Sequence, residues 1–279
     1  MAPALSTFTI FGVAILAGIV GAVLGLGGGI IIVPALTLLY GFEIRTAVAA
    51  SAVAVIATST GAAIAYLRDR ITNTRIAMLL EVGTTTGALS GALIAGLVPA
   101  RFLFLLFGGL MGYSAWSMFR ARKAELPEGV TPDRFSERLR LKGAYYDQSL
   151  GRTVAYQATG TLPGLGLMYL SGALAGLLGI GGGAFKVLAM DQVMRLPIKV
   201  STATSNFMIG VTAAAGAAVY FVRGDVDPLV AGPVALGVLA GAMVGARMMV
   251  RLKGSTLRLL FIPVLVYIAV QMAWKGASL

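Results

Sequence analysis

The sequence predicts an all-α integral membrane protein of two inverted repeats, each a glycine-broken re-entrant hairpin plus three transmembrane helices. The first observation is composition: 58% of the 279 residues are hydrophobic and only 12% are charged, whereas about 25% are charged in ordinary soluble domains. The second is that two glycine-rich stretches, 25–29 and 179–183, interrupt long apolar segments. Glycine disfavours helix, and a backbone break at membrane depth must be buried in protein or line a cavity.

Apolar stretches follow one another along the chain, and several could cross about 30 Å of hydrocarbon at roughly 1.5 Å per residue. They cover approximately residues 8–40, 46–67, 76–98, 102–119, 162–194, 200–222, 228–250 and 256–274. The stretches 8–40 and 162–194 contain the glycine breaks. The pieces on either side of the first break, Phe8–Leu24 and Ile30–Tyr40, are each short for a full span, which favours a re-entrant hairpin there.

The two halves of the chain repeat one another. A shift of 154 residues aligns them without gaps over some ninety residues, placing Gly18 on Gly172, Ser51 on Ser205, Tyr66 on Tyr220, and Gly83, Gly87 and Gly91 on Gly237, Gly241 and Gly245. The glycines spaced by four at 83–91 and 237–245 share one helix face. We expect these faces to be seams where helices pack closely.

Residues 120–161 separate the repeats and differ from them in character. Basic side chains replace the long apolar runs, at Arg120, Arg122, Lys123, Arg134, Arg138, Arg140, Lys142 and Arg152. Alternating residues at 139–142 and 153–156 flank Ser149-Leu150-Gly151 and predict a small β-hairpin. The chain therefore divides into a first transmembrane repeat (1–119), a cytoplasmic insertion (120–161) and a second transmembrane repeat (162–279).

The distribution of Lys and Arg favours inverted over parallel repeats. Eight plain crossings would put 13 basic residues on the N-terminal side and 8 on the other, with Lys186 in the membrane. Re-entrant hairpins would instead put 4 on one side (Arg45, Arg101, Arg223 and Lys275) and 17 on the other. Cytoplasmic loops carry an excess of Lys and Arg. We therefore expect both termini outside and residues 120–161 inside, with the net charge of +11 explained by basic loops and not by nucleic acid.

The glycine breaks are the candidate substrate site. Helix N-termini and successive glycine N–H groups bind oxyanions, so the candidate residues are Gly27, Gly28, Gly29, Gly181, Gly182 and Gly183. Lys186 lies three residues after Gly183, and a lysine within a membrane segment is a candidate functional residue. The alternatives are that Lys186 snorkels to an interface or pairs with an acid such as Asp191.

A second group of candidates lies on the neighbouring predicted helices. Ser51, Ser205 and Asn206 could hydrogen-bond an anion without a buried charge, or could hold helices together. Glu81 lies about two turns inside its apolar segment. It has a candidate proton-coupling role, and pairing with an Arg of the 68–75 loop is the favoured alternative.

Several chemistries are disfavoured. The chain has no Cys and no His, which excludes disulfides and histidine-based catalysis and leaves no usual zinc or haem ligands. The stretch 179–184 fits G-x-G-x-x-A, but no half-buried strand precedes it and no acid follows at the required spacing. Ser90-Gly91 resembles an intramembrane serine site without a conventional base. We expect no enzyme, no metal and no cofactor.

The glycine stretches resemble those of a known family. Residues 21–34 read GAVLGLGGGIIIVP and residues 176–187 read GLLGIGGGAFKV; this doubled pattern resembles the sulfite exporter TauE/SafE family, also called the toluene sulfonate uptake permease family. The resemblance covers nearly the whole chain. It implies a multi-pass permease of the bacterial inner membrane for sulfur-containing anions such as sulfite or organosulfonates. An anion channel is the alternative, and a homo-oligomer is left open.

Overall fold

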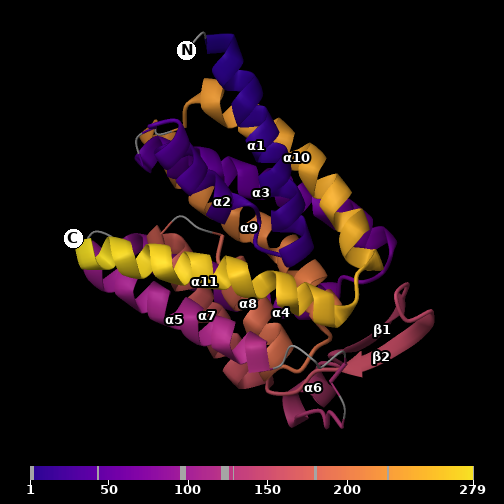
Figure 1. Cartoon of the computed structure of the whole chain (residues 1–279). Coiled ribbons are helices and arrows are strands. Elements are labelled where there is room, and N and C mark those ends of the chain that lie inside the picture. Colours follow the sequence, from indigo (N-terminus) through magenta and orange to yellow (C-terminus); the bar gives the residue numbers. More distant parts are fainter. Residues whose placement is uncertain are drawn as a thin grey trace.

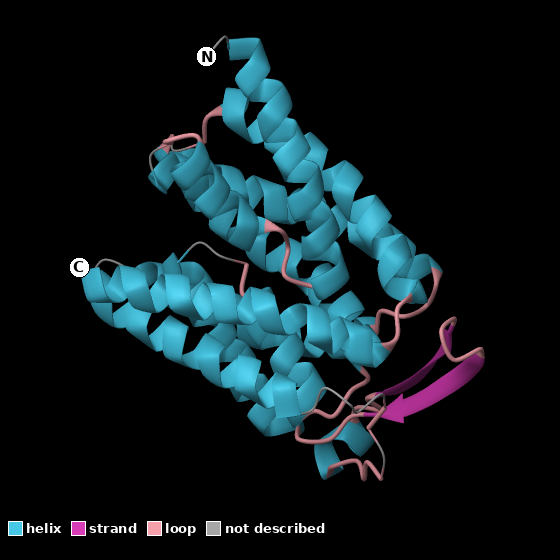
Figure 2. Ribbon diagram, viewed as in Figure 1, coloured by secondary structure: helices cyan, strands magenta, loops and turns pink. Residues whose placement is uncertain are grey.

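The structure, a computed structural model, is mainly helical (Figures 1 and 2). It describes residues 3–42, 44–94, 99–120, 126–127, 129–178, 181–224 and 226–278. Among these residues, four helical stretches are long and apolar enough to cross a membrane: Ala49–Arg68, Ile198–Val222, Pro228–Arg251 and Gly254–Ser278. The composition and these helices agree with a multi-pass, all-α membrane protein.

Each half begins with a broken helix and continues with three long helices. The first half contains α1 (Pro3–Leu24), α2 (Gly29–Pro34), a π-helical turn η1 (Ala35–Leu39), α3 (Ile44–Arg68), α4 (Thr74–Ile94) and α5 (Ala100–Arg120). The second contains α7 (Thr161–Leu178), α8 (Gly183–Leu188), the π-helical turn η2 (Ala189–Val193), α9 (Ile198–Arg223), α10 (Pro228–Arg251) and α11 (Gly254–Ser278). The predicted breaks at both glycine stretches are confirmed.

The two arms of the first broken segment differ in length from the prediction. α1 starts at Pro3 and has 22 residues, which span about 33 Å at the rise of an α-helix. The returning arm contains only the six residues of α2 and the five of η1. The helix α1 thus extends five residues before Phe8, whereas its apolar stretch Phe8–Leu24 is shorter than the four candidate spans, as expected.

The helices of the two halves pack reciprocally. Across the halves, α1 packs on α10 and α7 on α4, α3 packs on α10 and α9 on α4, and α3 packs on α9 and α5 on α11. The repeat counterparts are α1 and α7, α3 and α9, α4 and α10, and α5 and α11. When every helix is replaced by its counterpart, the same set of packed pairs results. The main interface of the molecule therefore lies between its two halves (Figure 1).

The predicted glycine seams form two of these interfaces. On α4, a Cβ on Gly87 or Gly91 would meet the carbonyl oxygen of Tyr169 or Ala173 on α7. On α10, the corresponding glycines, Gly241 and Gly245, lie against the carbonyls of Ile15 and Ile19 on α1. Small residues let backbones approach closely where lipid provides no hydrophobic drive between helices. The prediction of close-packing faces at 83–91 and 237–245 is confirmed.

The insertion contains a short helix α6 (Arg134–Arg138) and the antiparallel strands β1 (Lys142–Asp147) and β2 (Arg152–Gln157). The predicted hairpin is confirmed, but its first strand begins at Lys142 and not at Leu139. The carboxylate of Asp133 accepts hydrogen bonds from the N–H groups of Ser136 and Thr161, both at 2.6 Å. Asp133 therefore caps α6 and also fixes the start of α7.

Four segments meet at the end of the molecule that carries the insertion. In the α3–α4 connection, the backbone N–H of Asn73 donates to Thr204 Oγ1 of α9 at 3.2 Å, and its side-chain Nδ2 donates to the Tyr156 hydroxyl of β2 at 3.0 Å. Lys199, at the start of α9, reaches β1 and the end of α10. In Figure 1 both termini lie on the side away from the β1–β2 hairpin.

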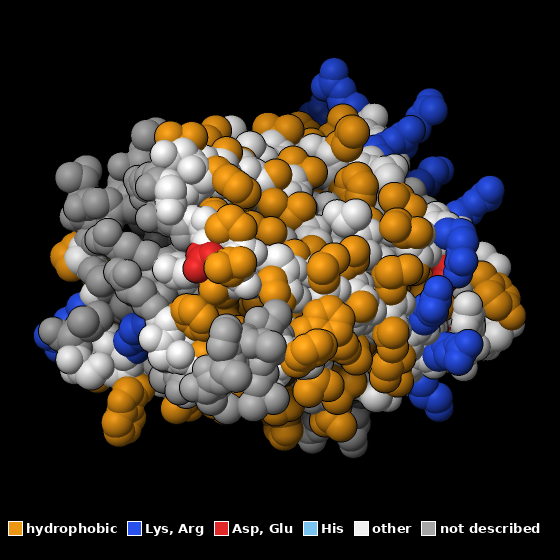
Figure 3. Space-filling model, turned by 90° about the horizontal axis from the view of Figure 1, so that it is seen from above, with side chains coloured by type: hydrophobic (Ala, Val, Ile, Leu, Met, Phe, Trp, Pro, Cys, Tyr) orange, Lys and Arg blue, Asp and Glu red, His pale blue; other side chains and the backbone are white. Residues whose placement is uncertain are grey.

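The outer surface of the helices is apolar. On α4, the side chains of Met78, Val82 and Leu89 are each more than half exposed. Figure 3 shows hydrophobic side chains across the middle of one face and most of the visible Lys and Arg side chains at one end. An apolar surface of this extent is typical of a protein that lies in lipid.

Candidate functional site

The two glycine breaks share a left-handed glycine directly before the returning helix. Gly28 and Gly182, which are counterparts in the repeat, immediately precede α2 and α8 and have φ values of 69° and 65°. Gly27 has a φ of 79°. Residues with a Cβ rarely adopt this left-handed conformation. Glycine is therefore required at both positions to turn the chain out of one helix and into the next.

The two breaks lie against each other at the centre of the molecule. A Cβ on Gly27 would lie 3.1 Å from side-chain carbons of both Val55 on α3 and Ile209 on α9, and a Cβ on Gly181 would lie 3.0 Å from the same two side chains. Val55 and Ile209 are themselves counterparts in the repeat. One pair of branched side chains therefore separates one pair of glycines, and the two halves meet symmetrically at this point.

Polar side chains of the neighbouring helices donate hydrogen bonds to backbone carbonyl groups at the first break. Ser205 Oγ donates to the carbonyl oxygen of Gly25 at 2.9 Å, and Asn206 Nδ2 donates to that of Ala22 at 2.8 Å. Thr58 Oγ1 donates to Gly27 O at 3.1 Å. Buried carbonyls without partners are costly, so these side chains stabilise the break. Ser205 and Asn206, from the second half, bond to the break of the first.

Other polar atoms beside the breaks remain available. Within the described part of the chain, Ser51 Oγ, Thr202 Oγ1 and Asn206 Oδ1 are buried and form no hydrogen bond. A Cβ on Gly29 would meet the Ser51 hydroxyl group. Native proteins rarely leave buried polar atoms unpaired, and each such atom calls for an explanation such as a water or ligand. Ser51, Ser205 and Asn206 thus all lie beside the first break.

The backbone donors of the first break are partly used within the turn. The N–H of Gly29 donates to Gly27 O at 2.8 Å, and the N–H groups of Ile31 and Ile32 bond to Gly28 O. The predicted nest of glycine donors therefore has fewer free N–H groups than the sequence pattern alone indicates. Side-chain hydroxyl and amide groups must supply part of any anion coordination at the first break.

The side chain of Lys186 is fully buried within the protein. Its Nζ donates to Thr212 Oγ1 of α9 at 2.6 Å and lies 3.8 Å from Oε2 of Glu81 on α4. Thr212 in turn donates to Glu81 Oε1 at 2.6 Å. The snorkelling alternative for Lys186 is wrong, because none of its side chain is exposed. Glu81 pairs with Lys186, and not with an arginine of the 68–75 loop as expected.

This polar network exists in one half only. In the repeat register, Lys186 corresponds to Ile32 and Glu81 corresponds to Ala235, while Thr212 corresponds to Thr58. Ile32 is also almost fully buried. The same structural position is therefore filled by an apolar side chain in one half and by a charged one in the other.

Sequence reasoning missed three residues of this region: Val55, Ile209 and Thr212. The repeat register contains a signal for each, because Val55 aligns with Ile209 and Thr58 aligns with Thr212. Register alone does not show that counterparts touch across the interface. The structure adds that information.

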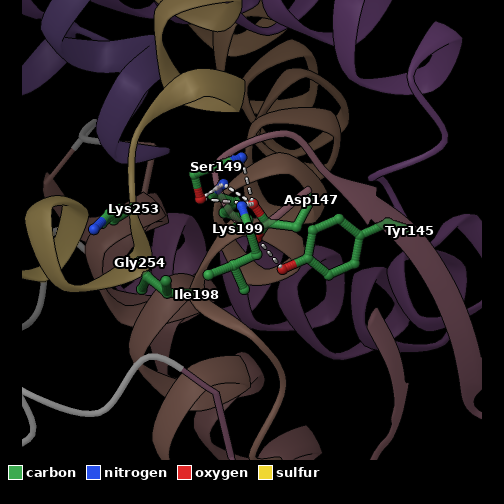
Figure 4. A pocket seen from close by; sticks show the side chains of 8 residues that line it. Tyr145, Asp147, Ser149, Ile198, Lys199, Lys253 and Gly254 are labelled. Atoms are coloured by element: carbon green, nitrogen blue, oxygen red, sulfur yellow. Dashed lines mark hydrogen bonds and ion pairs between the residues drawn. The ribbon is translucent and has the colours of Figure 1, made fainter. Parts of the chain in front are cut away.

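A second polar cluster lies apart from the breaks, where the insertion meets the helices (Figure 4). Lys199 Nζ donates to Asp147 Oδ1 at 2.7 Å, to Ser149 Oγ at 3.0 Å and to the carbonyl of Val250 at 3.2 Å. Figure 4 shows Lys253 and Gly254 on another side of the same small pocket. All three ammonium protons of Lys199 have partners, so Lys199 connects these elements and has no proton free for a ligand.

A comparison with protein-family models decides the family. Residues 10–272 match the family described as sulfite exporter TauE/SafE. The chain belongs to this family. Most of the helices described above, including both glycine breaks, fall within the TauE/SafE match.

Comparison with curated proteins finds relatives of similar length that are named probable membrane transporter proteins. The chain is 28% identical to the probable membrane transporter protein YunE of Bacillus subtilis (strain 168) over 269 residues, covering 94% of this chain and 95% of the relative. It is 27% identical to YdhB of the same organism, also named a probable membrane transporter protein, over 83% of this chain and 86% of the relative. A probable membrane transporter protein of Xylella fastidiosa (strain 9a5c) is 27% identical over 93% of both chains. No solved structure gives a significant match.

Proposed function

We propose that this protein is a secondary transporter, a permease, for small sulfur-containing anions such as sulfite or organosulfonates. The substrate binds between the two glycine breaks. The observation that carries the proposal is the meeting of both breaks at Val55 and Ile209, beside the unpaired polar atoms of Ser51 and Asn206. Discontinuous helices at a repeat interface are the usual substrate sites of secondary transporters.

The site combines the backbone of both breaks with nearby polar side chains. Its residues are Gly27, Gly28, Gly29, Gly181, Gly182, Gly183, Ser51, Ser205, Asn206 and Lys186. The glycines permit close approach of an anion to the backbone, and the hydroxyl and amide groups provide hydrogen bonds without a fixed charge. Lys186 lies one helical turn beyond Gly182, since its N–H bonds to Gly182 O at 3.2 Å, and provides the positive charge.

The packing of the connections supports inverted repeats around this site. Hydrogen bonds join the α3–α4 connection to the insertion and to α9, and join the start of α9 to the insertion and to the end of α10. Eight plain crossings would put the α3–α4 connection and the start of α9 on opposite sides of the membrane. Re-entrant segments at both breaks put them on the same side, and the hairpin tips then enter from opposite faces.

The closed packing at the centre favours a carrier over a channel. Val55 and Ile209 lie against both Gly27 and Gly181, so a continuous path would require α3 and α9 to move apart. In a carrier, rocking of one half against the other performs this movement around a fixed site. Counterflow of labelled substrate in liposomes whose membrane potential is held at zero distinguishes the two, because a channel then does not accelerate uptake when unlabelled substrate is placed inside.

A binding screen with one pair of variants tests the proposal. Purified protein is titrated with sulfite, thiosulfate, sulfoacetate, taurine and matching carboxylates. Gly181→Ala places a methyl group 3.0 Å from Val55 and Ile209, and we expect it to weaken binding of the best sulfur anion at least about tenfold. Gly166→Ala is the matched control, because a Cβ there meets no atom within 4 Å. No binding of any sulfur anion, or equal loss in both variants, contradicts the proposed site.

A further inference from the structure

We propose that Glu81 is a proton-binding site and that the transported anion takes its place beside Lys186, so that one proton accompanies each monovalent anion. The inference rests on the proposed function, since it assigns the coupling ion of the same site. A hydronium ion transfers its proton to Oε2 of Glu81, so one O–H bond of the donor breaks, one O–H bond forms on the carboxylate, and water is released. The products are a neutral Glu81 and an ammonium group paired with the anion.

The geometry shows that the pair of Glu81 and Lys186 is loose. Their closest charged atoms are 3.8 Å apart, and the shorter contacts run through the hydroxyl group of Thr212, at 2.6 Å to each. A second buried pair among the described residues, Lys199 with Asp147, is in direct contact at 2.7 Å. Charge-assisted hydrogen bonds are normally near 2.7–2.9 Å. Replacing the carboxylate partner of Lys186 by another anion should therefore cost less interaction energy than replacing the carboxylate partner of Lys199.

The carboxylate of Glu81 is only partly held. Oε1 accepts hydrogen bonds from Thr212 and, at 3.1 Å, from Thr85. Oε2 is buried and, among the described residues, accepts no hydrogen bond. The side chain as a whole is 14% exposed, whereas Lys186 is not exposed at all. Glu81 is therefore the member of the pair that can exchange protons with the surroundings.

Charge balance connects the proton to the anion. Lys186 and Glu81 together are neutral when both are ionised. A monovalent anion beside Lys186 would leave one uncompensated negative charge in a low-dielectric site, which is strongly unfavourable. A nearby like charge favours the neutral form of a carboxylic acid. Protonation of Glu81 restores neutrality, so anion binding and proton binding strengthen each other.

The other half of the molecule shows that packing alone does not need the charges. Ile32 and Ala235 occupy the positions that correspond to Lys186 and Glu81. Replacing a buried ion pair by apolar residues is often neutral or stabilising. The charged pair, present in one half only, therefore requires a reason other than stability.

Few other charged groups could take over this role. α4 packs against α7 and α9. α7 contains no Asp, Glu, Lys or Arg, and its titratable residue is Tyr169; α9 carries Lys199 and Arg223 near its two ends and Tyr220 between them. η2, which follows α8 and also packs on α7 and α9, contributes Asp191. The ion pair of Glu81 is with Lys186.

The test counts protons taken up with the anion. The sulfonate that binds most tightly in the screen is titrated calorimetrically into the full-length protein in buffers of different ionisation enthalpy. We expect the unchanged protein to take up about one proton for each monovalent anion that binds. Where Glu81 must be protonated on binding, the affinity for the anion should fall about tenfold for each unit by which the pH rises. Glu81→Gln should bind with no proton uptake and with affinity independent of pH. Asp147→Asn, which alters the other buried pair, should keep one proton per anion.

Two outcomes overturn the inference, and both leave the proposed function intact. One is binding of a sulfonate with no proton uptake by the unchanged protein. The other is unaltered proton uptake in Glu81→Gln. If Glu81→Gln fails to fold, the double variant Glu81→Gln/Lys186→Met replaces it, because the double variant leaves no charge unpaired. The double variant should fold. Its affinity for the anion should be at least about tenfold lower than that of the unchanged protein, and binding should take up no proton. Absence of any sulfonate binding contradicts the proposed function itself.

Discussion

At the scale of single residues, the glycines of the interface differ sharply in what a methyl group would meet. Gly166 and Gly172 both lie on α7. A Cβ on Gly172 would press on the backbone of Thr84, with its Cα at 2.8 Å, whereas a Cβ on Gly166 meets no atom within 4 Å. The seam between α4 and α7 therefore depends on Gly172 and is indifferent to Gly166.

This difference makes a prediction about stability. We expect Gly172→Ala to destabilise the protein by about 1–3 kcal/mol, because the backbone of α4 must move to relieve the overlap. Gly166→Ala should be neutral or slightly stabilising, since alanine favours helix over glycine by about 1 kcal/mol. Thermal unfolding in detergent, followed by the loss of monodisperse protein, measures both. A Gly172→Ala protein as stable as Gly166→Ala would show that α4 and α7 do not pack as described.

Several residues of the candidate site could be picked out as candidates from the sequence, but their hydrogen-bond and ion-pair partners could not. Lys186, Ser205 and Asn206 stand out in the sequence as polar groups in apolar segments. Their partners lie far away in the chain: Asn206 bonds to Ala22, and Lys186 pairs with Glu81. Periodicity and repeat register report which face a residue occupies and which residue is its counterpart. They carry no information about contacts between halves.

At the scale of elements, the β1–β2 hairpin is held to the helices through Asp147. Burial by itself would raise the pKa of Asp147, but hydrogen bonds from Lys199 and Ser149 and the charge of Lys199 hold it below its ordinary value. A carboxylate with a lowered pKa contributes stability above its unfolded pKa and loses it as pH falls through the folded value. Docking of the hairpin should therefore be independent of pH near neutrality and weaken only below about pH 4.

Asp147→Asn tests this docking. Removal of one member of a buried pair leaves Lys199 uncompensated and costs about 3–5 kcal/mol. We expect the amides of 142–157 to exchange hydrogen about 100-fold faster, measured by mass spectrometry at neutral pH, with little change in α4 and α7. Tyr146→Phe is the control on the same strand, because the Tyr146 side chain is 57% exposed. Equal protection in both variants would mean that Lys199 does not hold the hairpin.

Element types could be predicted more reliably than element ends. The glycine breaks, the long helices and the hairpin all follow from local composition and periodicity. The start of β1 was misplaced at Leu139, because Leu139 and Leu141 alternate with basic residues as a strand would. In the structure Arg140 has a φ of 51° and Leu141 packs into a core cluster with Met190 and Met194. Tertiary packing therefore overrides the local preference for a strand at residues 139–141.

At the scale of the whole molecule, the repeat determines which surfaces must meet. α1, α3, α4 and α5 each pack on a helix of the other half, and the pairs exchange when the halves are exchanged. The first half does not satisfy its own break alone, since Ser205 and Asn206 of the second half bond to carbonyls of the first break. The second half therefore stabilises the first, and any movement of one half against the other must change these contacts.

Membrane orientation gives the last prediction. With a re-entrant hairpin in each half, Arg101 at the start of α5 lies outside and Gly129 in the insertion lies inside. The chain has no cysteine, so Arg101→Cys and Gly129→Cys each introduce a single reactive thiol at an exposed position. In intact cells a membrane-impermeant maleimide should label Arg101→Cys, and should label Gly129→Cys only after permeabilisation. Labelling of the two from the same face would contradict a single membrane crossing by α5, which lies between them. The reverse pattern, with Gly129→Cys outside, would overturn the positive-inside assignment, in which cytoplasmic loops collect the basic residues.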